Sequence, residues 1–440
     1  MNAGNLSAGA SVPTRRVVLI LCLAFLIRVT SVLLNPHEPV SDEMEYHRLA
    51  VSLVADHSYS IDGVPTAYRA PGYPAFLAVV YAIVGPAPLA AKFVQALLDA
   101  ITAGFLFLLG RKSSDISGMI AATLWCIFPP AILYVNYLLS ESLAIFLITL
   151  ALLLLIDAPL ERISLRWLLL GLTIGCLILT KPIFLPLPFL LLAFGRKLNL
   201  SRVHGIALIG AIVLVLAPWI ARNSVVMGQT GLSTNGGINL FIGNNPDATG
   251  SFQGRFPPEL ASDAIDEVTR NQLAFSLGID YILRHPATFM INGAKKIAHV
   301  FRTEGDVLIG SFPRSAATDT AGFRERYASL PVIPVVLTNA GYFSVVLLAI
   351  AGIFRVPRNA SYWFAAALFV TILAVHSIYF GGSRYHYPLM PVGVLFAAHY
   401  VVSRGGAGGK RSGPAALVSL TSGLALVVIW SYELALVYSR

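Results

Sequence analysis

Long apolar runs recur along this chain, and they restrict its fold more than any other feature. A helix that crosses a bilayer needs about 20 mostly apolar residues. Convincing runs lie near residues 17–34, 88–110, 116–135, 137–156, 166–181, 203–221, 331–354, 361–380, 387–403 and 414–437. A shorter, proline-broken run at 183–195 makes an eleventh, because the alternation of loops across the membrane requires it. The sequence therefore predicts an all-α polytopic membrane protein with about eleven to thirteen crossings.

Composition agrees with this class and disfavours others. Of the 440 residues, 56% are hydrophobic and 12% are charged, whereas soluble domains carry about 25% charged residues. Basic residues outnumber acidic ones, 31 to 22, but they lie in short clusters, so nucleic acid is not an expected partner. Cys22, Cys126 and Cys176 lie inside apolar runs without CxxC spacing, which indicates packing rather than a metal site or a disulfide framework.

The basic clusters predict the orientation of the chain. If the amino terminus is cytoplasmic, the connectors on the same side contain fourteen basic residues, namely Arg15, Arg16, Arg111, Lys112, Arg162, Arg166, Arg196, Lys197, Arg202, Arg355, Arg358, Arg404, Lys410 and Arg411. Positive charge concentrates on the cytoplasmic side of membrane proteins. The expected organisation is a single transmembrane domain over residues 1–440, with large outer loops at 35–86 and 222–330.

Both outer loops contain segments that are too short or too polar to cross a membrane. The first begins with SDEMEYHRLA, in which Ser41 followed by acids predicts a capped helix start, and this helix is expected to lie along the interface. Residues 71–85 predict a second interfacial or re-entrant helix. The second loop begins with the turn-rich STNGGINLFIGNNPDATG and continues into an amphipathic stretch at 265–301.

Acids at the outer boundary are the candidates for catalysis. Asp42 and Glu43 are adjacent where an apolar run gives way to the first loop. Helix capping by these carboxylates explains them, and a catalytic base or metal ligand is the alternative. Glu141 begins a later run, where an ionised carboxylate costs up to about 2.5–3.5 kcal/mol if it reaches the helix centre. That cost suggests a functional residue, and snorkelling to the interface is the alternative.

Three cations are expected at the same boundary. Arg69 precedes the second interfacial helix, Lys181 ends a crossing, and Arg384 precedes another crossing. Each could be an interfacial anchor, but together with the acids they suggest a site for an anion. Arginine binds phosphate as a bidentate fork and lysine as a point charge, so a lipid phosphate at the headgroup level is the expected ligand.

Other polar residues near these charges allow ordinary explanations. Interfacial aromatic belts account for the neighbouring tyrosines, Tyr46, Tyr68, Tyr73, Tyr385 and Tyr387. The histidines show neither HxxxH nor HxxE spacing and are expected to be structural, namely His47, His376 and His386. The GNNPDATG turn contains Asn244, Asn245 and Asp247. These side chains could hydrogen-bond to sugar hydroxyls, and Asx turns explain them equally well.

The order of these motifs resembles the membrane-embedded glycosyltransferases of the GT-C class, in particular the bacterial branch related to protein O-mannosyltransferases and to the aminoarabinose transferases that modify lipid A. The resemblance extends from about Arg15 to Tyr400. It rests on DExxY at 42–46, RxPGYP at 69–74, LSES at 139–142, TKP at 180–182, APWIARN at 217–223, STNGGINLFIGNNPDATG at 233–250 and RYHYPLMP at 384–391.

This resemblance implies transfer of a sugar from a polyprenyl-phosphate donor at the periplasmic face of the bacterial inner membrane, usually with inversion. The family's first-loop acid falls at Asp42, and its later acid falls at Glu141, where aminoarabinose transferases have aspartate. Their first-loop lysine falls at Arg69, and the lysine ending the later span falls at Lys181. Tyr68 replaces the acid that precedes the first-loop lysine, so a divalent cation bound through that acid is doubtful here.

The residues and the resemblance together give an expected assignment of roles. Asp42 is the expected base, with Glu43 or Glu141 orienting the acceptor or a metal ion. The expected substrate-binding residues are Tyr46, Arg69, Lys181, Arg384 and Tyr385. If the acceptor is itself a phosphate, no deprotonation is needed and Asp42 orients groups or stabilises positive charge on the sugar.

The end of the sequence bears on the acceptor, and the lack of an internal repeat bears on the alternative function. The chain ends almost directly after its last run, which favours a lipid such as lipid A, or a glycan, over a protein acceptor. The alternative is a transporter or flippase of lipid-linked sugars, but such proteins often show repeated halves and ionisable residues near the midplane. Here no repeat is evident and the polar residues cluster at the outer boundary.

Overall fold

The computed structural model describes residues 14–156, 163–198, 200–262, 264–311, 323–356, 358–405 and 413–438. Within these ranges most residues lie in helices. Its described strands are β1 (Ser60–Ile61) and β2 (Val64–Pro65), which pair antiparallel in the first outer loop. The predicted all-α class is confirmed.

The apolar runs form two groups of helices. The first group contains α1 (Thr14–Leu34), α4 (Pro88–Gly110), α5 (Asp115–Cys126), α6 (Pro129–Tyr134), α7 (Ser140–Ile156), α8 (Ile163–Thr180), η2 (Pro182–Phe184), α9 (Leu187–Ala193) and α10 (Arg202–Met227). The second contains α17 (Val332–Gly352), α18 (Ala360–Ile378), η3 (Ser383–Tyr385), η4 (Tyr387–Leu389), α19 (Met390–Gly405) and α20 (Gly413–Tyr438). Each of the eleven predicted runs coincides with a helix or with two successive helical segments.

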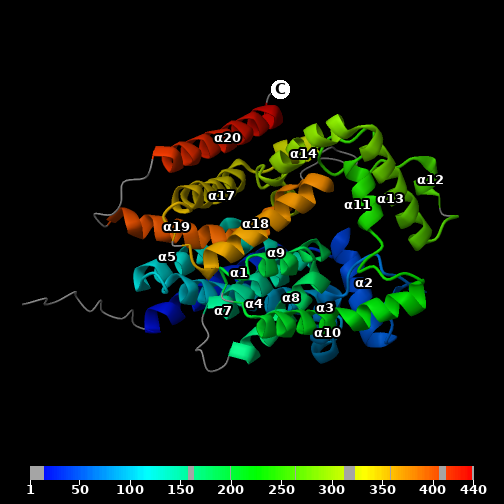
Figure 1. The fold of residues 1–440 in the computed structure, drawn as a ribbon, viewed down its shortest axis with the longest axis horizontal. Coiled ribbons are helices and arrows are strands. Elements are labelled where there is room, and N and C mark those ends of the chain that lie inside the picture. Colours follow the sequence, from blue (N-terminus) through cyan, green and yellow to red (C-terminus); the bar gives the residue numbers. More distant parts are fainter. Residues whose placement is uncertain are drawn as a thin grey trace, which may run out of the picture.

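The two predicted outer loops contain the remaining helices. The first loop forms α2 (Asp42–Ala55) and α3 (Gly72–Val84), close to the predicted interfacial pair. The second loop forms α11 (Gly236–Gly243), α12 (Pro258–Ala261), α13 (Glu267–Arg284), α14 (Pro286–Val300), α15 (Gly305–Ser311) and α16 (Phe323–Ala328). Figure 1 places α2, α11, α12 and α13 at the same end of the molecule.

Some predicted runs differ from the observed helices at prolines. The run at 116–135 is split because Pro129 and Pro130 start a new helix, α6, where the missing backbone N–H groups cause no loss. The amphipathic stretch at 265–301 is likewise divided at His285, since Pro286 begins α14. The RYHYPLMP segment forms short 3-10 turns before α19 begins at Met390.

Among the described residues, four helices have both the length and the apolar character needed to cross a membrane, namely Thr14–Leu34, Pro88–Gly110, Arg202–Met227 and Val332–Gly352. Shorter apolar helices of 10–17 residues occupy most of the other predicted runs.

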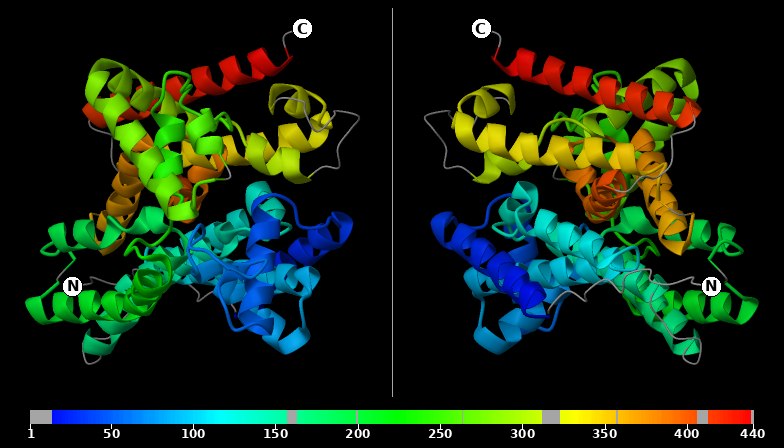
Figure 2. Two further views of the ribbon diagram at one scale, coloured as in Figure 1. Left: turned by 90° about the vertical axis from the view of Figure 1, so that its right-hand side faces the viewer. Right: turned by 90° about the vertical axis from the view of Figure 1, so that its left-hand side faces the viewer.

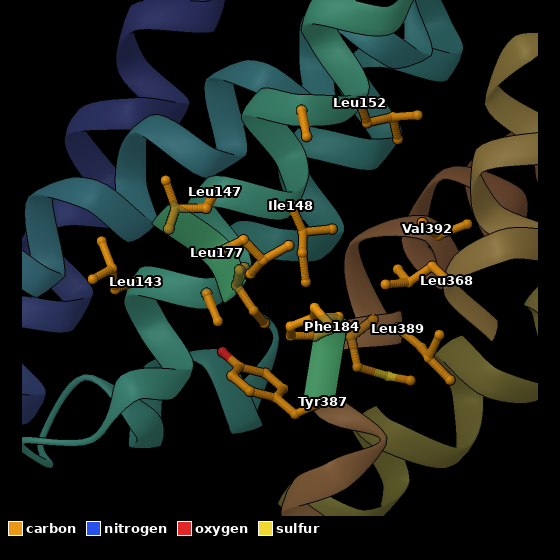
Figure 3. Packing of buried hydrophobic residues seen from close by; sticks show 14 of the residues in the cluster. Leu143, Leu147, Ile148, Leu152, Leu177, Phe184, Leu368, Tyr387, Leu389 and Val392 are labelled. Atoms are coloured by element: carbon orange, nitrogen blue, oxygen red, sulfur yellow. The ribbon is translucent and has the colours of Figure 1, made fainter. Parts of the chain in front are cut away.

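The two groups of helices share one hydrophobic core. Figure 2 shows the first group on one side of the molecule and α17 and α20 on the other. Leu147 and Ile148 of α7 belong to the same buried cluster as Leu368 of α18 and Val392 of α19, and Figure 3 shows this cluster from close by. The core therefore connects the two groups of helices.

A buried ion pair that was not predicted from the sequence lies inside this helical bundle. Arg28 of α1 and Asp99 of α4 are 0% and 1% exposed, and the guanidinium contacts the Asp99 carboxylate. Arg28 also donates to the carbonyl oxygens of Trp125 and Cys126 at 2.9 and 3.0 Å, at the end of α5. Because breaking a buried pair leaves an uncompensated charge, this contact ties α1, α4 and α5 together.

Candidate active site

Asp42 is the first residue of α2 and faces cations rather than the helix backbone. Ser41 precedes it with φ 50°, in the left-handed region that serine rarely adopts, and its side chain makes no capping hydrogen bond. The predicted serine cap is therefore wrong, although the helix begins where the acids predict it. Three acids in the first turn still favour the helix start electrostatically, namely Asp42, Glu43 and Glu45.

Two arginines from distant segments meet at Asp42. Arg69 Nη2 lies 2.6 Å from Asp42 Oδ1, and Arg384 Nη1 lies 2.9 Å from Asp42 Oδ2. Arg69 Nε also donates to Glu45 Oε2 at 2.6 Å. Burial alone would raise the pKa of Asp42, but Arg384 and Arg69 outweigh it and lower the pKa to about 2. Asp42 is thus ionised at neutral pH.

A second acid and cation pair lies in the same region. Lys181 Nζ donates to Glu141 Oε1 at 2.8 Å, and the Glu141 side chain is 2% exposed. Gly72 allows the first loop to approach this pair closely, because any larger residue would place a Cβ 2.5 Å from the backbone nitrogen of Thr180. The start of α3 therefore packs directly on the end of α8, which brings the RxPGYP and TKP motifs together.

The segment that carries Arg384 is fixed by a second network. Asp306 Oδ2 accepts from the backbone N–H of Arg384 at 3.3 Å, and Arg302 donates to Asp306 Oδ1 at 2.8 Å. Tyr385 stacks on the imidazole of His376, with ring centroids 4.2 Å apart. These contacts hold η3 against α15 and α18.

A cavity of about 550 Å³ opens between these elements. It is lined by seven of the eight predicted site residues, namely Asp42, Tyr46, Arg69, Glu141, Lys181, Arg384 and Tyr385. Two of them that are in direct contact, Asp42 and Arg384, are 342 residues apart in sequence. The folding of the chain thus gathers the boundary charges into one concave site, which is the usual setting for ligand binding.

Glu43 is the predicted site residue that does not line the cavity. Its carboxylate is buried and accepts from the backbone N–H of Leu138 at 2.8 Å. His37 Nε2 lies 3.1 Å from the other carboxylate oxygen. These contacts join the start of α2 to the turn before α7, so Glu43 is placed to support the site rather than to touch a substrate.

Residues that the sequence interpretation did not assign also line the cavity. Asn235 and Asn239 of the STNGGINLF segment are among them, as is His376, which was expected to be structural. The spacing of the two asparagines, i and i+4 on α11, was the available signal, because such residues share a helix face. By contrast, Asn244 and Asn245 are buried and donate to main-chain carbonyls, and Asn245 Oδ1 accepts from the backbone N–H of Asp247 at 2.8 Å, which is an Asx turn.

The cavity does not offer the donor set of a divalent cation. Among the described residues, no group of three or more His, Cys, Asp or Glu side chains is placed to hold a metal ion. The two carboxylates that line the cavity, Asp42 and Glu141, both contact cationic side chains, whereas Mg²⁺ and Ca²⁺ require several uncommitted oxygen ligands. Tyr68, where the resemblance leads one to expect an acid, lies against Arg69, with 5.2 Å between the guanidinium carbon and the ring centroid.

Comparisons with known proteins give limited likenesses. No family model matches the chain, and no curated protein matches it. Among solved structures, the chain is similar to ArnT from Cupriavidus metallidurans bound to undecaprenyl phosphate, with 15% identity and a TM-score of 0.46, over 89% of this chain and 79% of that chain. The apo state of the same protein gives 16% identity and a TM-score of 0.44, over 89% and 78%. Likenesses of this size leave function to be argued from the site itself.

Proposed function

We propose that this protein is a GT-C-type glycosyltransferase of the bacterial inner membrane. In this proposal it moves a hexose or pentose from a polyprenyl-phosphate donor to a lipid A, glycan or protein acceptor at the periplasmic face, with inversion. The observation that carries the proposal is the convergence of Arg69, Lys181 and Arg384 on a cavity that also contains Asp42 and Glu141.

The cations of the cavity suit a phosphate. Its described lining contains three cationic side chains and two carboxylates, and Arg69 also contacts Glu45 outside the lining, so a phosphate would bind by replacing carboxylates as the partner of the arginines. A donor phosphodiester is anionic, and the phosphate gains further charge as the sugar leaves. Positive groups fixed at that position stabilise the transition state more than the ground state.

The apolar part of the cavity suits an isoprenoid chain. Ile183, Leu185 and Pro186 line it from η2 and the turn before α9, and Val375 and Ile378 line it from α18. Leu185 is 44% exposed. A lipid-linked donor would therefore place its phosphate at the cations and its tail between these two segments.

The transfer reaction assigns a role to each charged group. A bond forms between an acceptor oxygen and the anomeric carbon, while the bond from that carbon to the phosphate oxygen breaks and its electron pair stays on the phosphate. Phosphate binding to Arg69 and Arg384 would draw these groups away from Asp42 and raise its pKa, so that it becomes a better base for the acceptor hydroxyl. With a phosphate acceptor, no proton is removed and Asp42 orients the reactants.

A flippase of lipid-linked sugars is the second candidate, because it would also need an anion site. The position of the acids favours an enzyme. Asp42 lies directly between two of the cations, where its charge competes with a phosphate, and a role in chemistry or in orienting an acceptor would account for a carboxylate at this position.

Asp42→Asn tests the proposed function. Purified protein in detergent is given a panel of radiolabelled polyprenyl-phosphate sugars together with lipid A and membrane glycan acceptors. We expect Asp42→Asn to lower transfer by about 10²–10⁴-fold, the usual contribution of a positioned acid or base, while polyprenyl phosphate still binds. Glu38→Gln, which changes an exposed acid of the same loop, is the control.

Two results would contradict the enzyme proposal. One is full transfer by Asp42→Asn, and the other is no transfer by the wild type together with sugar-lipid translocation in vesicles. Mass spectrometry of lipid A, surface glycans and glycoproteins from a deletion strain identifies donor and acceptor together, because the missing sugar and its attachment are read in one experiment.

A further inference from the structure

We infer that Asn235 and Asn239, with His376, form the subsite for the sugar ring, and that this subsite takes a neutral, hydroxylated sugar rather than an amino sugar. The inference rests on the proposed function, because it assumes a polyprenyl-phosphate sugar as the donor. It concerns the part of the cavity that the charged residues do not occupy.

Asn235 is the N-cap residue of α11 and Asn239 lies in its first turn, where the Asn239 backbone N–H donates to the Asn235 backbone oxygen at 2.9 Å. They lie one helical turn apart, and both line the cavity. Ser233 donates to Asn235 Oδ1 at 2.9 Å, which leaves the Asn235 amide nitrogen free of side-chain partners in the described part of the chain. The Asn239 amide makes no side-chain hydrogen bond to any residue that the structure describes. An amide both donates and accepts, which matches the hydroxyl groups of a sugar.

His376 lines the same cavity and has a buried ring nitrogen without a partner among the described residues. Its Nδ1 lies 2.9 Å from the backbone oxygen of Phe380, which can only accept, so Nδ1 carries the proton and Nε2 has the free lone pair. The residue is 3% exposed, and Nε2 has no partner among the described residues. A buried unpaired acceptor is costly unless a ligand group satisfies it. A sugar hydroxyl would do so.

Close glycine contacts hold the asparagines in place. A Cβ at Gly237 would lie 1.9 Å from the backbone oxygen of Asn271 in α13, and a Cβ at Gly243 would lie 1.6 Å from the backbone oxygen of Tyr379. The helix α11 is thus pressed between α13 and the end of α18. Rigid support of this kind makes hydrogen-bond geometry selective.

The charges near the subsite exclude a cationic sugar. An amino sugar is recognised through an uncommitted carboxylate, but Asp42 already contacts Arg69 and Arg384, and Glu141 already contacts Lys181. Among the described lining residues no other carboxylate is present. Arg69, Lys181 and Arg384 would each repel an ammonium group placed beside them. A neutral hexose or pentose meets no such penalty.

Binding measurements with matched donors test this inference. The probes are polyprenyl phosphate alone, polyprenyl-phosphate glucose, mannose, galactose and xylose, and polyprenyl-phosphate aminoarabinose, each titrated against purified protein by thermal shift. For the wild type, we expect at least one neutral sugar to bind about tenfold or more tightly than polyprenyl phosphate alone, the size of one or two net hydrogen bonds. The amino sugar should show no such gain.

Variants locate that gain in the subsite. Asn239→Leu, which keeps the size of the side chain without its amide, should remove most of the gain and leave the affinity for polyprenyl phosphate unchanged. Asn239→Asp, which adds a carboxylate of the same shape, should weaken the neutral sugar and strengthen the amino sugar. Gln253→Ala removes an amide from the same outer loop outside the cavity and should change neither affinity.

The outcomes separate this inference from the proposed function. If polyprenyl phosphate fails to bind the wild type, the proposed function fails. If polyprenyl phosphate binds but Asn239→Leu retains the full gain, or if the amino sugar binds better than every neutral sugar, the sugar subsite is overturned while the phosphate site stands.

Discussion

At the residue scale, Lys296 shows how a buried cation can be held without an acid. It lies in α14, outside the predicted crossings, and is fully buried. Its ammonium donates to Asn244 Oδ1 at 2.9 Å and to the backbone oxygen of Ile378 at 2.8 Å. These bonds join α14 to the GNN turn and to the end of α18, behind the sugar subsite. Burial lowers the pKa of Lys296 from 10.5 to about 8.

That pKa predicts a pH dependence of stability. Between about pH 8 and 10.5 the unfolded chain keeps the lysine proton that the folded chain has lost, so the free energy of unfolding should rise with pH in this window. We expect Lys296→Met to remove this contribution. The difference in melting temperature between wild type and variant is measured from pH 7 to 10.

The neighbouring residue supplies the control for this measurement. Lys295 is exposed on the same helix, so Lys295→Met should follow the wild-type pH profile. An unchanged slope in Lys296→Met would show that Lys296 does not titrate in this window.

At the element scale, α11 depends on glycines where it meets its neighbours. Gly243 approaches the main chain of Tyr379 so closely that a Cβ would overlap the backbone oxygen. Backbone cannot yield as the end of a flexible side chain can, so a methyl group must displace α11. The GGINLFIG sequence therefore sets the distance between this helix and α18, and with it the shape of the cavity.

Gly243→Ala should consequently destabilise the protein by about 1–3 kcal/mol, the usual cost of overpacking, and lower donor affinity. Gly236→Ala is the matched control for stability, because a Cβ at Gly236 meets nothing within 4 Å. Thermal unfolding in detergent compares the two variants. Equal melting temperatures for both would contradict the proposed rigidity of α11.

At the scale of the whole molecule, two groups of helices share a core and the outer-loop helices gather at one end (Figures 1 and 2). The basic clusters of the sequence predict that this end faces the periplasm. The direction of the chain across the membrane determines which substrates can reach the cavity, since polyprenyl-linked sugars are available outside and nucleotide sugars inside.

Cysteine labelling in intact cells tests this orientation. With Cys22, Cys126 and Cys176 replaced by alanine, a cysteine at exposed Arg255 in the second outer loop should react with a membrane-impermeant maleimide. A cysteine at exposed Arg196, in a predicted cytoplasmic connector, should react only after the cells are permeabilised. The reverse labelling pattern would show that the second outer loop faces the cytoplasm, which would contradict a periplasmic active site.

Much of the fold was predictable because apolar length and proline act locally. The runs located the helices, while Pro129 and Pro286 changed their boundaries where the sequence alone had predicted continuous segments. The predicted serine cap of α2 was wrong, since Ser41 adopts a left-handed backbone conformation and its side chain does not cap the helix. Local propensity yields where tertiary contacts favour another conformation.

The sequence by itself determined the class of the protein, its helices and the types of charged residues at the outer boundary, because hydrophobicity and charge are properties of single residues and short runs. Only the tertiary structure decided which charges meet. It paired Asp42 with Arg384, 342 residues away, removed Glu43 from the cavity, and placed Asn235 and Asn239 in it instead of Asn244 and Asn245. Contacts between distant segments depend on how helices pack, and no local pattern records that packing.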